Sequence, residues 1–335
     1  MKNFAYYRPS TAEEAVGLLD NMWGSSELLA GGTDLHDLQK EYVAQPEKVV
    51  SLNGLGKEFR QITRDKEAVT IGAGVTLAEI AASKDLAAFP ALTSAAGIIG
   101  GPQIRNMGTL GGNLCQRNRC WYFRDEHVQC LLKGGRKCYA TEGENRYHAI
   151  FTTGHPCVIV NPSTLAPVLM AFGAGAEVLG PKGKRTVSVG KLFQAPKSAE
   201  QREHTLAPNE VLLSVKIPVV FEGLANASYE VRHKQSYDWP LVQAVAGFQL
   251  NPETKAAQGV RIVLGHVAPT PLVAKEAATS LEGRKVTEES AAAAGKAATE
   301  GASTLSQNAY KLKLVEVAVK RAILTAAGAK RYWEV

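Results

Sequence analysis

The pattern of hydrophobic and polar positions in the first 100 residues predicts short strands that alternate with helices. Runs rich in β-branched and aromatic residues are typical of strands, and apolar residues three and four apart are typical of helices. The expected strands are residues 4–8, 27–30, 48–52, 58–64 and 68–73. The expected helices are residues 9–21, 35–41 and 76–83, the first with Ser10 and Glu13 at capping-box spacing. This alternation predicts a mixed α/β fold.

A second regular region follows residue 157. Its expected strands are residues 158–160, 176–179, 185–189 and 211–217, with a helix over residues 164–172. After a boundary near residues 220–226, a three-stranded antiparallel meander is expected, over residues 228–234, 242–250 and 260–267. Helices are expected over residues 272–281, 287–298 and 308–325. The chain is therefore predicted to form one domain over 1–222 and another over 223–335.

Between these regions, residues 97–116 are rich in Gly, Asn and Gln, and residues 116–157 have no regular pattern. All five cysteines of the chain lie here, at positions Cys115, Cys120, Cys130, Cys138 and Cys157. Four thiolates in a loop-rich segment can hold an iron–sulfur cluster. A structural zinc site usually has closely spaced C-x2-4-C pairs, which only the first two cysteines approach. The spacing of the cysteines alone does not decide between an iron–sulfur cluster, a zinc site and free thiols.

Composition narrows the class of protein. The chain has 335 residues, of which 45% are hydrophobic and 21% charged, with a net charge of +6. No Lys/Arg block alternates with aromatic residues, which argues against nucleic-acid binding. Two stretches with few charges, residues 86–104 and 155–176, are too interrupted by Pro, Gly and polar residues to span a membrane. Met1–Pro9 has neither the apolar core nor the cleavage site of a secretory signal, and a chain of this length folds without disulfides.

Two glycine-rich turns carry the candidate cofactor chemistry. In the first, a strand runs into Gly31-Gly32-Thr33-Asp34, where successive N–H groups can hold a pyrophosphate. The second turn is Gly108-Thr109-Leu110-Gly111-Gly112-Asn113. Neither turn is a G-x-G-x-x-G motif, and neither has a Walker lysine. Each turn alone is commonplace, but two of them about 75 residues apart suggest one extended, phosphate-containing cofactor held from both sides.

These motifs carry a family resemblance. Residues 30–35 and 108–114 resemble the two flavin-binding signatures of the FAD subunit of molybdenum hydroxylases, a group that includes xanthine dehydrogenase, carbon monoxide dehydrogenase and aldehyde oxidoreductases. Residues 210–218 and 263–271 extend the resemblance over essentially the whole chain.

The resemblance implies an α+β protein. A PCMH-type (VAO-like) FAD-binding fold of two α/β subdomains, about 1–55 and 56–222, is expected to precede a C-terminal α+β domain with a three-stranded antiparallel sheet and helices. The implied cofactor is FAD. The implied FAD contacts are Leu28, Leu29, Ala30, Gly31, Gly32, Thr33, Asp34, Leu35, Gly108, Thr109, Gly111, Gly112, Asn113, Ser163, Thr164 and Leu212.

Ser163 and Thr164 stand where many relatives have an Asp after a Ser or Gly, so a hydroxyl replaces a carboxylate toward the ribityl or pyrophosphate group. Leu212 is expected to pack near the isoalloxazine. A lysine common near the flavin edge is replaced around Glu230, with Arg232 and Lys234 nearby.

The cysteine region resembles one subgroup of the family. Residues 117–124 and 143–149 are similar to the FAD subunit of a periplasmic aldehyde oxidoreductase, which carries an additional [4Fe-4S] cluster in an insertion. The insertion here is residues 116–157. Position-by-position matching implies that the cluster ligands are Cys120, Cys130, Cys138 and Cys157. Cys115 is left as a spare thiol near the flavin.

The function implied is that of an electron-transfer subunit. Substrate oxidation takes place at a molybdenum cofactor on a molybdopterin-binding large subunit. Electrons pass through the [2Fe-2S] centres of a small subunit to the FAD of this chain and then to an external acceptor. The assembly is a heterotrimer or its dimer, cytoplasmic, or periplasmic by co-export with a signal-bearing partner. No catalytic acid or base is expected in this chain.

Two alternative functions are compatible with the sequence. In the first, the chain is a flavin-binding scaffold whose cysteine site is structural, with zinc or a cluster and little electron flow. In the second, it is a single-chain flavin oxidoreductase. Such an enzyme needs its own substrate domain, for which the roughly 110 residues after the boundary are few.

Overall fold

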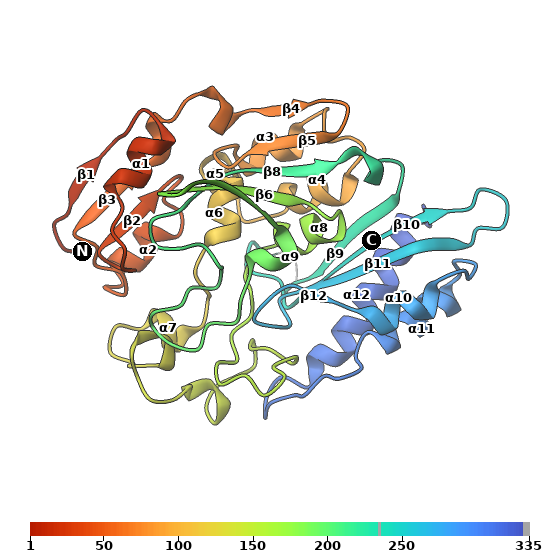
Figure 1. The fold of residues 1–335 in the computed structure, drawn as a ribbon. Coiled ribbons are helices and arrows are strands. Elements are labelled where there is room, and N and C mark those ends of the chain that lie inside the picture. The colour runs from red at the N-terminus through yellow and green to blue at the C-terminus, as the bar shows by residue number, and fades with distance from the viewer. Residues whose placement is uncertain (234–235, 331–335) are drawn as a thin grey trace.

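The computed structural model describes residues 1–233 and 236–330, and this part of the chain contains three β-sheets in sequence order (Figure 1). The N-terminal sheet is parallel, in the order β1-β3-β2. Its strands are β1 (Ala5–Tyr7), β2 (Ser26–Leu29) and β3 (Lys48–Ser51), and its helices are α1 (Ala12–Leu18) and α2 (Leu35–Lys40). Parallel strands need crossover connections, which these two helices supply.

The first helix starts one residue later than the predicted capping pair. Thr11, not Ser10, is the N-cap of α1, and its hydroxyl accepts a hydrogen bond from the Glu14 backbone N–H at 3.1 Å. The Glu14 carboxylate accepts one from the Ser10 backbone N–H at 2.8 Å. The prediction of Ser10 with Glu13 was therefore wrong by one position, because Thr11 offers an equally good hydroxyl at the next residue.

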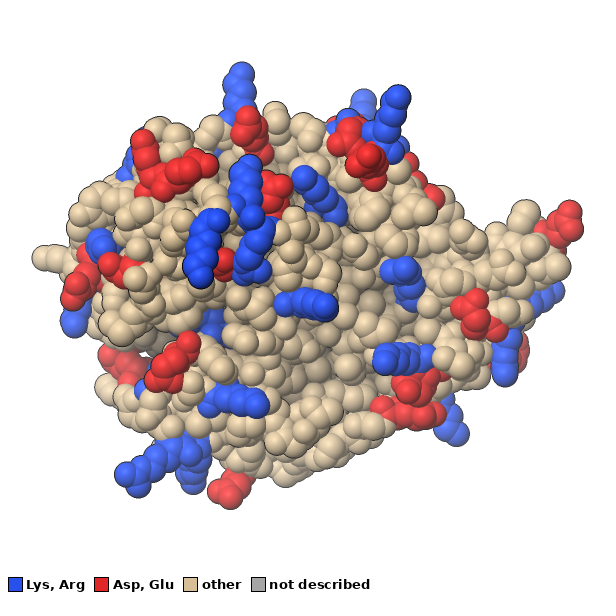
Figure 2. Space-filling model, in the orientation of Figure 1, with Lys and Arg blue, Asp and Glu red and all other residues tan. Residues whose placement is uncertain are grey.

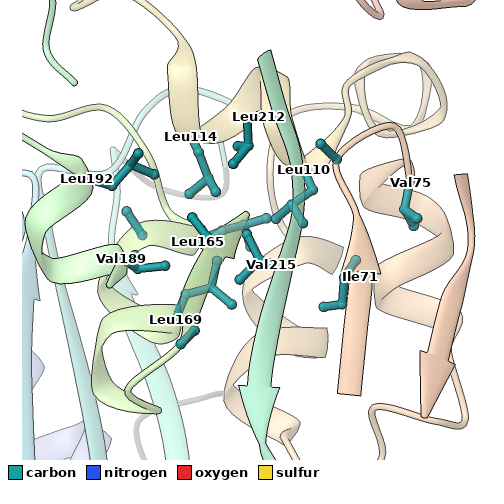
Figure 3. Close-up of a cluster of buried hydrophobic side chains, with 14 of the residues drawn as sticks. Ile71, Val75, Leu110, Leu114, Leu165, Leu169, Val189, Leu192, Leu212 and Val215 are labelled. Atoms are coloured by element: carbon teal, nitrogen blue, oxygen red, sulfur yellow. The ribbon is translucent and has the colours of Figure 1, made fainter. Parts of the chain in front are cut away.

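The second sheet has five antiparallel strands in the order β4-β5-β8-β6-β7. These strands are β4 (Ile62–Arg64), β5 (Ala68–Gly72), β6 (Gly175–Gly180), β7 (Gly183–Ser188) and β8 (Val211–Pro218). Its helices are α3 (Leu77–Ala82), α4 (Pro90–Gly97), α5 (Pro102–Met107), α6 (Leu110–Cys115), α8 (Leu165–Ala171) and α9 (Val189–Leu192). The Gly-rich stretch 97–116 thus forms short helices. Side chains of α6, α8 and β8 meet in the main apolar core (Figure 3).

The predicted strand over residues 158–160 is not a regular strand in the structure. The backbone there bonds to irregular neighbours: Val158 O accepts from the Ala149 N–H at 2.9 Å, and the Asn161 N–H donates to Ala268 O at 2.9 Å. Residues 158–160 are apolar because they are buried under loops and not because they belong to a sheet.

The C-terminal sheet is antiparallel, in the order β12-β11-β10-β9, so a fourth strand joins the three that were predicted. The strands are β9 (Ala225–Val231), β10 (Val242–Leu250), β11 (Ala257–Gly265) and β12 (Leu272–Val273). The helices are α10 (Lys275–Leu281), α11 (Glu288–Ala297) and α12 (Tyr310–Ala326). The added strand β12 is two residues long, which is too short to show the alternating pattern that predicts a strand. The predicted strand end at Lys234 lies outside the described residues.

This sheet separates two apolar cores. Successive side chains of a strand point to opposite faces. In β10, Val242, Ala244 and Phe248 belong to the core shared with the C-terminal helices, whereas Val245 belongs to the core of the five-stranded sheet. Burial on both faces explains why β10 is apolar at almost every position. The division of domains at residues 222 and 223 stays a prediction.

The cysteine-bearing segment, defined here as residues 116–157, leaves α6 and returns to α8 below the sheets in Figure 1. It contains the short helix α7 (Trp121–Arg124) and single helical turns at Leu131–Lys133 and Tyr139–Thr141. Phe123, Leu132 and Cys130 form a small core with Leu38 of α2. The segment is therefore packed against α2.

The described residues include no helix that is both long and apolar enough to cross a membrane. Figure 2 shows scattered basic and acidic side chains, some of them next to one another, on a face that is mostly uncharged.

Candidate functional site

A cavity of about 520 Å³ lies between β2, the start of α6, strand β8 and the cysteine-bearing segment. Most of the predicted FAD contacts line it. They are Leu28, Leu29, Ala30, Gly31, Gly32, Thr33, Asp34, Leu35, Gly108, Thr109, Gly111, Gly112 and Leu212. The fold thus brings both glycine turns and strand β8, about 100 residues farther along the chain, to one cavity.

The two glycine turns lie in direct contact, and this contact explains the first glycine. A Cβ atom on Gly31 would lie 1.8 Å from the carbonyl oxygen of Met107, the residue before the second turn. Gly32 has φ +76°, in the left-handed region that favours glycine. A side chain at Gly31 therefore forces the two turns apart.

The turns differ in which backbone amides are free. In the second turn, the N–H groups of Leu110 and Gly111 donate to Val75 O and Ala73 O at 2.9 and 2.8 Å. The Gly112 N–H donates to Thr109 Oγ1 at 3.1 Å. Among residues 1–233 and 236–330, by contrast, no acceptor is found for the N–H groups of residues 31–34. Consecutive free amides form an anion-binding concavity, so the first turn suits the pyrophosphate of FAD and the second fastens α6.

One wall of the cavity is apolar. Leu212 of β8 is 4% exposed and lies close to Leu114 of α6 (Figure 3). Phe59 and Leu206 continue this wall. Cys115 also lines the cavity, and burial raises the pKa of its thiol to about 12, so it is a neutral thiol. An aromatic ring system such as isoalloxazine fits a wall of this kind.

Three predicted contacts lie behind the cavity wall. Ser163 Oγ donates to Asn113 Oδ1 at 2.7 Å, and this oxygen also accepts from the Leu165 N–H at 3.3 Å. Thr164 Oγ1 lies 3.4 Å from His266 Nε2. These bonds join the start of α8 to α6 and to the C-terminal sheet. A contact of Asn113, Ser163 or Thr164 with FAD stays a prediction.

The residues at the predicted flavin edge form a buried ion pair. Arg232 Nη2 lies 2.6 Å from Glu230 Oε2, and burial raises the pKa of Glu230. Neither side chain is among those that line the cavity.

The cavity is also lined by a polar group that the sequence did not predict. Arg202 bonds to Glu27 Oε1 at 2.8 Å and stacks over Trp23, 4.8 Å from the ring centroid. His204 meets the same ring edge-on at 5.5 Å. Burial raises the pKa of Glu27 to about 7. Glu27 and Arg202 are 175 positions apart, and no local motif joins them.

Two buried histidines make stability sensitive to acid. Burial lowers the pKa of His204 to about 4 and that of His266 to about 3, whereas both titrate near 6.5 in the unfolded chain. The unfolded state then binds more protons between these values. We expect the free energy of unfolding to fall as pH drops from about 6.5 to about 4, by at most about 1.4 kcal/mol per pH unit for each histidine.

Urea denaturation across this pH range measures the effect. His204→Gln should make the pH profile shallower than that of the wild type. His127→Gln is the control, because the His127 side chain is 85% exposed. Equal slopes for wild type and His204→Gln would contradict the expectation.

The four cysteines predicted as cluster ligands lie together. Each sulfur is near at least two of the others, close enough for charge on one thiolate to raise the pKa of another. A hydrogen bond between Cys138 and Cys157 lowers the pKa of Cys138 to about 6 and raises that of Cys157. Burial raises the pKa of Cys120 to about 12. For Cys115 burial is the sole cause of its raised pKa, so its sulfur lies apart from this group.

Backbone N–H groups face the four sulfurs. They belong to residues that follow the cysteines in the chain, namely Tyr122, Phe123, Leu132, Lys133, Ala140, Thr141, Val158 and Ile159, and each lowers the pKa of the thiol it faces. His148 adds a side-chain contact, with Nε2 3.2 Å from Cys120 Sγ. N–H groups directed at sulfur stabilise thiolates and suit the ligands of an iron–sulfur cluster.

The four sulfurs do not meet at one point as the ligands of a single metal ion do. In the part of the chain that the structure describes, no three His, Cys, Asp or Glu side chains converge closely enough to hold one metal ion. Zinc bonds to sulfur at about 2.3 Å and draws four thiolates to one point.

Comparison with known proteins places this geometry in a family. Residues 2–220 match the family described as FAD binding domain in molybdopterin dehydrogenase, and residues 227–326 match the CO dehydrogenase flavoprotein C-terminal domain. The chain therefore belongs to the FAD-binding domain family of molybdopterin dehydrogenases. The prediction of an FAD-binding oxidoreductase subunit of the molybdenum hydroxylase family, with an α+β fold, is confirmed.

Individual relatives agree with this assignment. The aldehyde oxidoreductase FAD-binding subunit PaoB of Escherichia coli (strain K12) is 33% identical over 274 residues, 81% of this chain and 83% of that protein. The carbon monoxide dehydrogenase medium chain of Hydrogenophaga pseudoflava is 29% identical over 328 residues, 96% of each chain. A chain of reconstituted CO dehydrogenase from Oligotropha carboxidovorans superimposes with a TM-score of 0.76 at 25% identity, covering 98% of this chain and 99% of that one.

Proposed function

We propose that this chain is the medium subunit of a heterotrimeric molybdenum hydroxylase of the aldehyde oxidoreductase or xanthine dehydrogenase type. It passes electrons from the [2Fe-2S] centres of a small subunit to its FAD and on to an external acceptor. The observation that carries the proposal is the shared wall: the cysteine-bearing segment supplies Phe123, Leu132 and Lys133 to the cavity that both glycine turns line. The relatives are named FAD-binding subunit and medium chain, which supports partner subunits here too.

A [4Fe-4S] cluster on Cys120, Cys130, Cys138 and Cys157 is part of this proposal. Its support is the grouping of four thiols, the backbone N–H groups that face them, and the separate position of Cys115. A cluster of this kind accepts and releases single electrons.

The chain's own residues bind and shield the flavin. The free N–H groups of the Gly31–Asp34 turn hold the pyrophosphate, and the wall that contains Leu212 excludes water from the ring. When bound, FAD supplies the electron-exchange chemistry. None of these roles requires a general acid or base.

The isolated chain can be used to test whether it binds FAD without oxidising a substrate. We expect the purified subunit to bind FAD and to oxidise no aldehyde, because substrate oxidation belongs to the molybdenum cofactor of a partner. FAD binding is measured by quenching of flavin fluorescence, and oxidation by dye reduction with an aldehyde panel. Aldehyde turnover by the chain free of partner subunits would refute the proposal and favour a single-chain oxidoreductase.

Metal analysis decides between the proposal and the scaffold alternative. An anaerobically purified sample should contain about four iron and four sulfide per chain, the content of one [4Fe-4S] cluster. One zinc per chain without sulfide would assign the cysteines a structural role instead.

A further inference from the structure

Asp34 has an unusual set of partners for a residue in a cofactor turn. Its Oδ2 accepts a hydrogen bond from the Arg117 backbone N–H at 2.8 Å. Its Oδ1 lies 2.6 Å from Arg124 Nη2 and 2.9 Å from Arg119 Nη1. The three side chains of these ion pairs are between 13% and 19% exposed. Both carboxylate oxygens are therefore engaged by the start of the cysteine-bearing segment.

Asp34 is also the N-cap residue of α2, yet its side chain makes no capping bond. An Asp at this position ordinarily accepts from the first turn of its own helix. Here the Asp34 carboxylate bonds to the cysteine-bearing segment instead.

A second carboxylate holds the same stretch from the other side. Glu203 is 2% exposed, and its oxygens accept from Arg117 Nε at 2.8 Å and from Asn118 Nδ2 at 2.6 Å. Beyond these anchors the segment continues into the cavity wall with Phe123, Leu132 and Lys133. The wall is thus tied to the turn whose amides face the cofactor.

We infer that Asp34 is a positioning residue that couples FAD binding to the order of the cysteine-bearing segment. Its backbone forms the cofactor turn, and its carboxylate docks residues 117–124 onto that turn. Ordering of either part then favours the other, and such coupling acts equally in both directions. The inference rests on the proposed function only in taking FAD as the occupant of the cavity.

The test compares variants on the two sides of the contact. Asp34→Asn removes the charge from the turn, and Arg124→Gln removes a partner that does not line the cavity. We expect both variants to raise the FAD dissociation constant about tenfold. Both should also speed amide hydrogen exchange in residues 117–133, with and without FAD. Asp37→Asn is the matched control, because Asp37 is 53% exposed and bonds to the same Arg124. We expect a change of less than about twofold there, since exposed pairs contribute little.

Two results would overturn the inference. If Asp34→Asn weakens FAD binding while Arg124→Gln does not, the carboxylate acts on the cofactor directly. If amide exchange in residues 117–133 stays at the wild-type rate in both variants, the contact does not order the segment. Circular dichroism of Arg124→Gln separates either result from global unfolding. Because each variant is compared with a wild type of the same iron content, absence of a cluster would refute that part of the proposed function and leave this inference standing.

Discussion

We expect Cys130→Ser to abolish the iron and sulfide content of the purified chain and Cys115→Ser to leave it unchanged. Cys130 is 6% exposed and belongs to the group of four mutually close thiols. A serine hydroxyl there leaves three thiolates for a cluster that takes four. Cys115 lines the flavin cavity and has no electrostatic contact with the other cysteines.

Iron, acid-labile sulfide and the visible spectrum of anaerobic samples measure this pair of variants. The wild type should hold about four iron per chain, Cys115→Ser the same, and Cys130→Ser almost none. Loss of iron in Cys115→Ser with retention in Cys130→Ser would mean that the ligand set is misassigned.

We expect Gly31→Ala to weaken FAD binding strongly. The new methyl group would lie 1.8 Å from Met107 O, which is backbone and cannot rotate away. Relief requires the two glycine turns to separate, at a cost at or above the roughly 1–3 kcal/mol typical of overpacking. The N–H groups of residues 31–34 then lose their arrangement around the pyrophosphate. We expect FAD affinity to fall by about a hundredfold or more, which corresponds to ~2.7 kcal/mol.

Equilibrium dialysis of the apoprotein with FAD measures the change. Gly56→Ala is the control, because a Cβ on Gly56 would meet no atom within 4 Å and its φ of −61° suits alanine. The control should bind FAD like the wild type. If Gly31→Ala binds FAD within about threefold of the wild type, the turn relaxes more easily than its packing indicates.

The contact between Asp34 and three arginines gives the cysteine-bearing segment a defined place in the molecule. Insertions in loops tend to be mobile because few buried contacts hold them. This one is held by two carboxylates, by a small apolar core that includes Leu38, and by cation–π stacking of Arg119 on Trp239 at 4.3 Å. A redox centre carried on it would therefore keep a fixed position relative to the flavin cavity.

Local sequence predicted most strands and helices because their signals are local. The periodicity of residues 211–217 and 242–250 reflects burial that each strand experiences by itself, and both were found as β8 and β10. The two residues of strand β12 were expected as the start of the helix over residues 272–281, because two residues are too few to show the period of a strand. The apolar run at residues 158–160 was misassigned because burial beneath loops leaves the same pattern as burial in a sheet.

The local sequence of the two glycine turns does not show which of them has free backbone amides. Both were interpreted as phosphate cradles, since glycine-rich turns with free amides look alike in sequence. The structure separates them through hydrogen bonds to Ala73 and Val75, residues about 35 positions before the second turn. The ion pair between Glu27 and Arg202 could not be predicted from the sequence either, because a long-range ion pair has no local motif.

By itself the sequence predicted the family, which the comparisons confirm, because the motifs that carry the resemblance are short and local. The glycine turns as FAD contacts and the four cysteines as cluster ligands stay predictions. Only the tertiary structure decided which amides remain free, which predicted contacts reach the cavity, and that Asp34 bonds to the cysteine-bearing segment. These depend on distances between residues far apart in the chain, and such distances are set by packing.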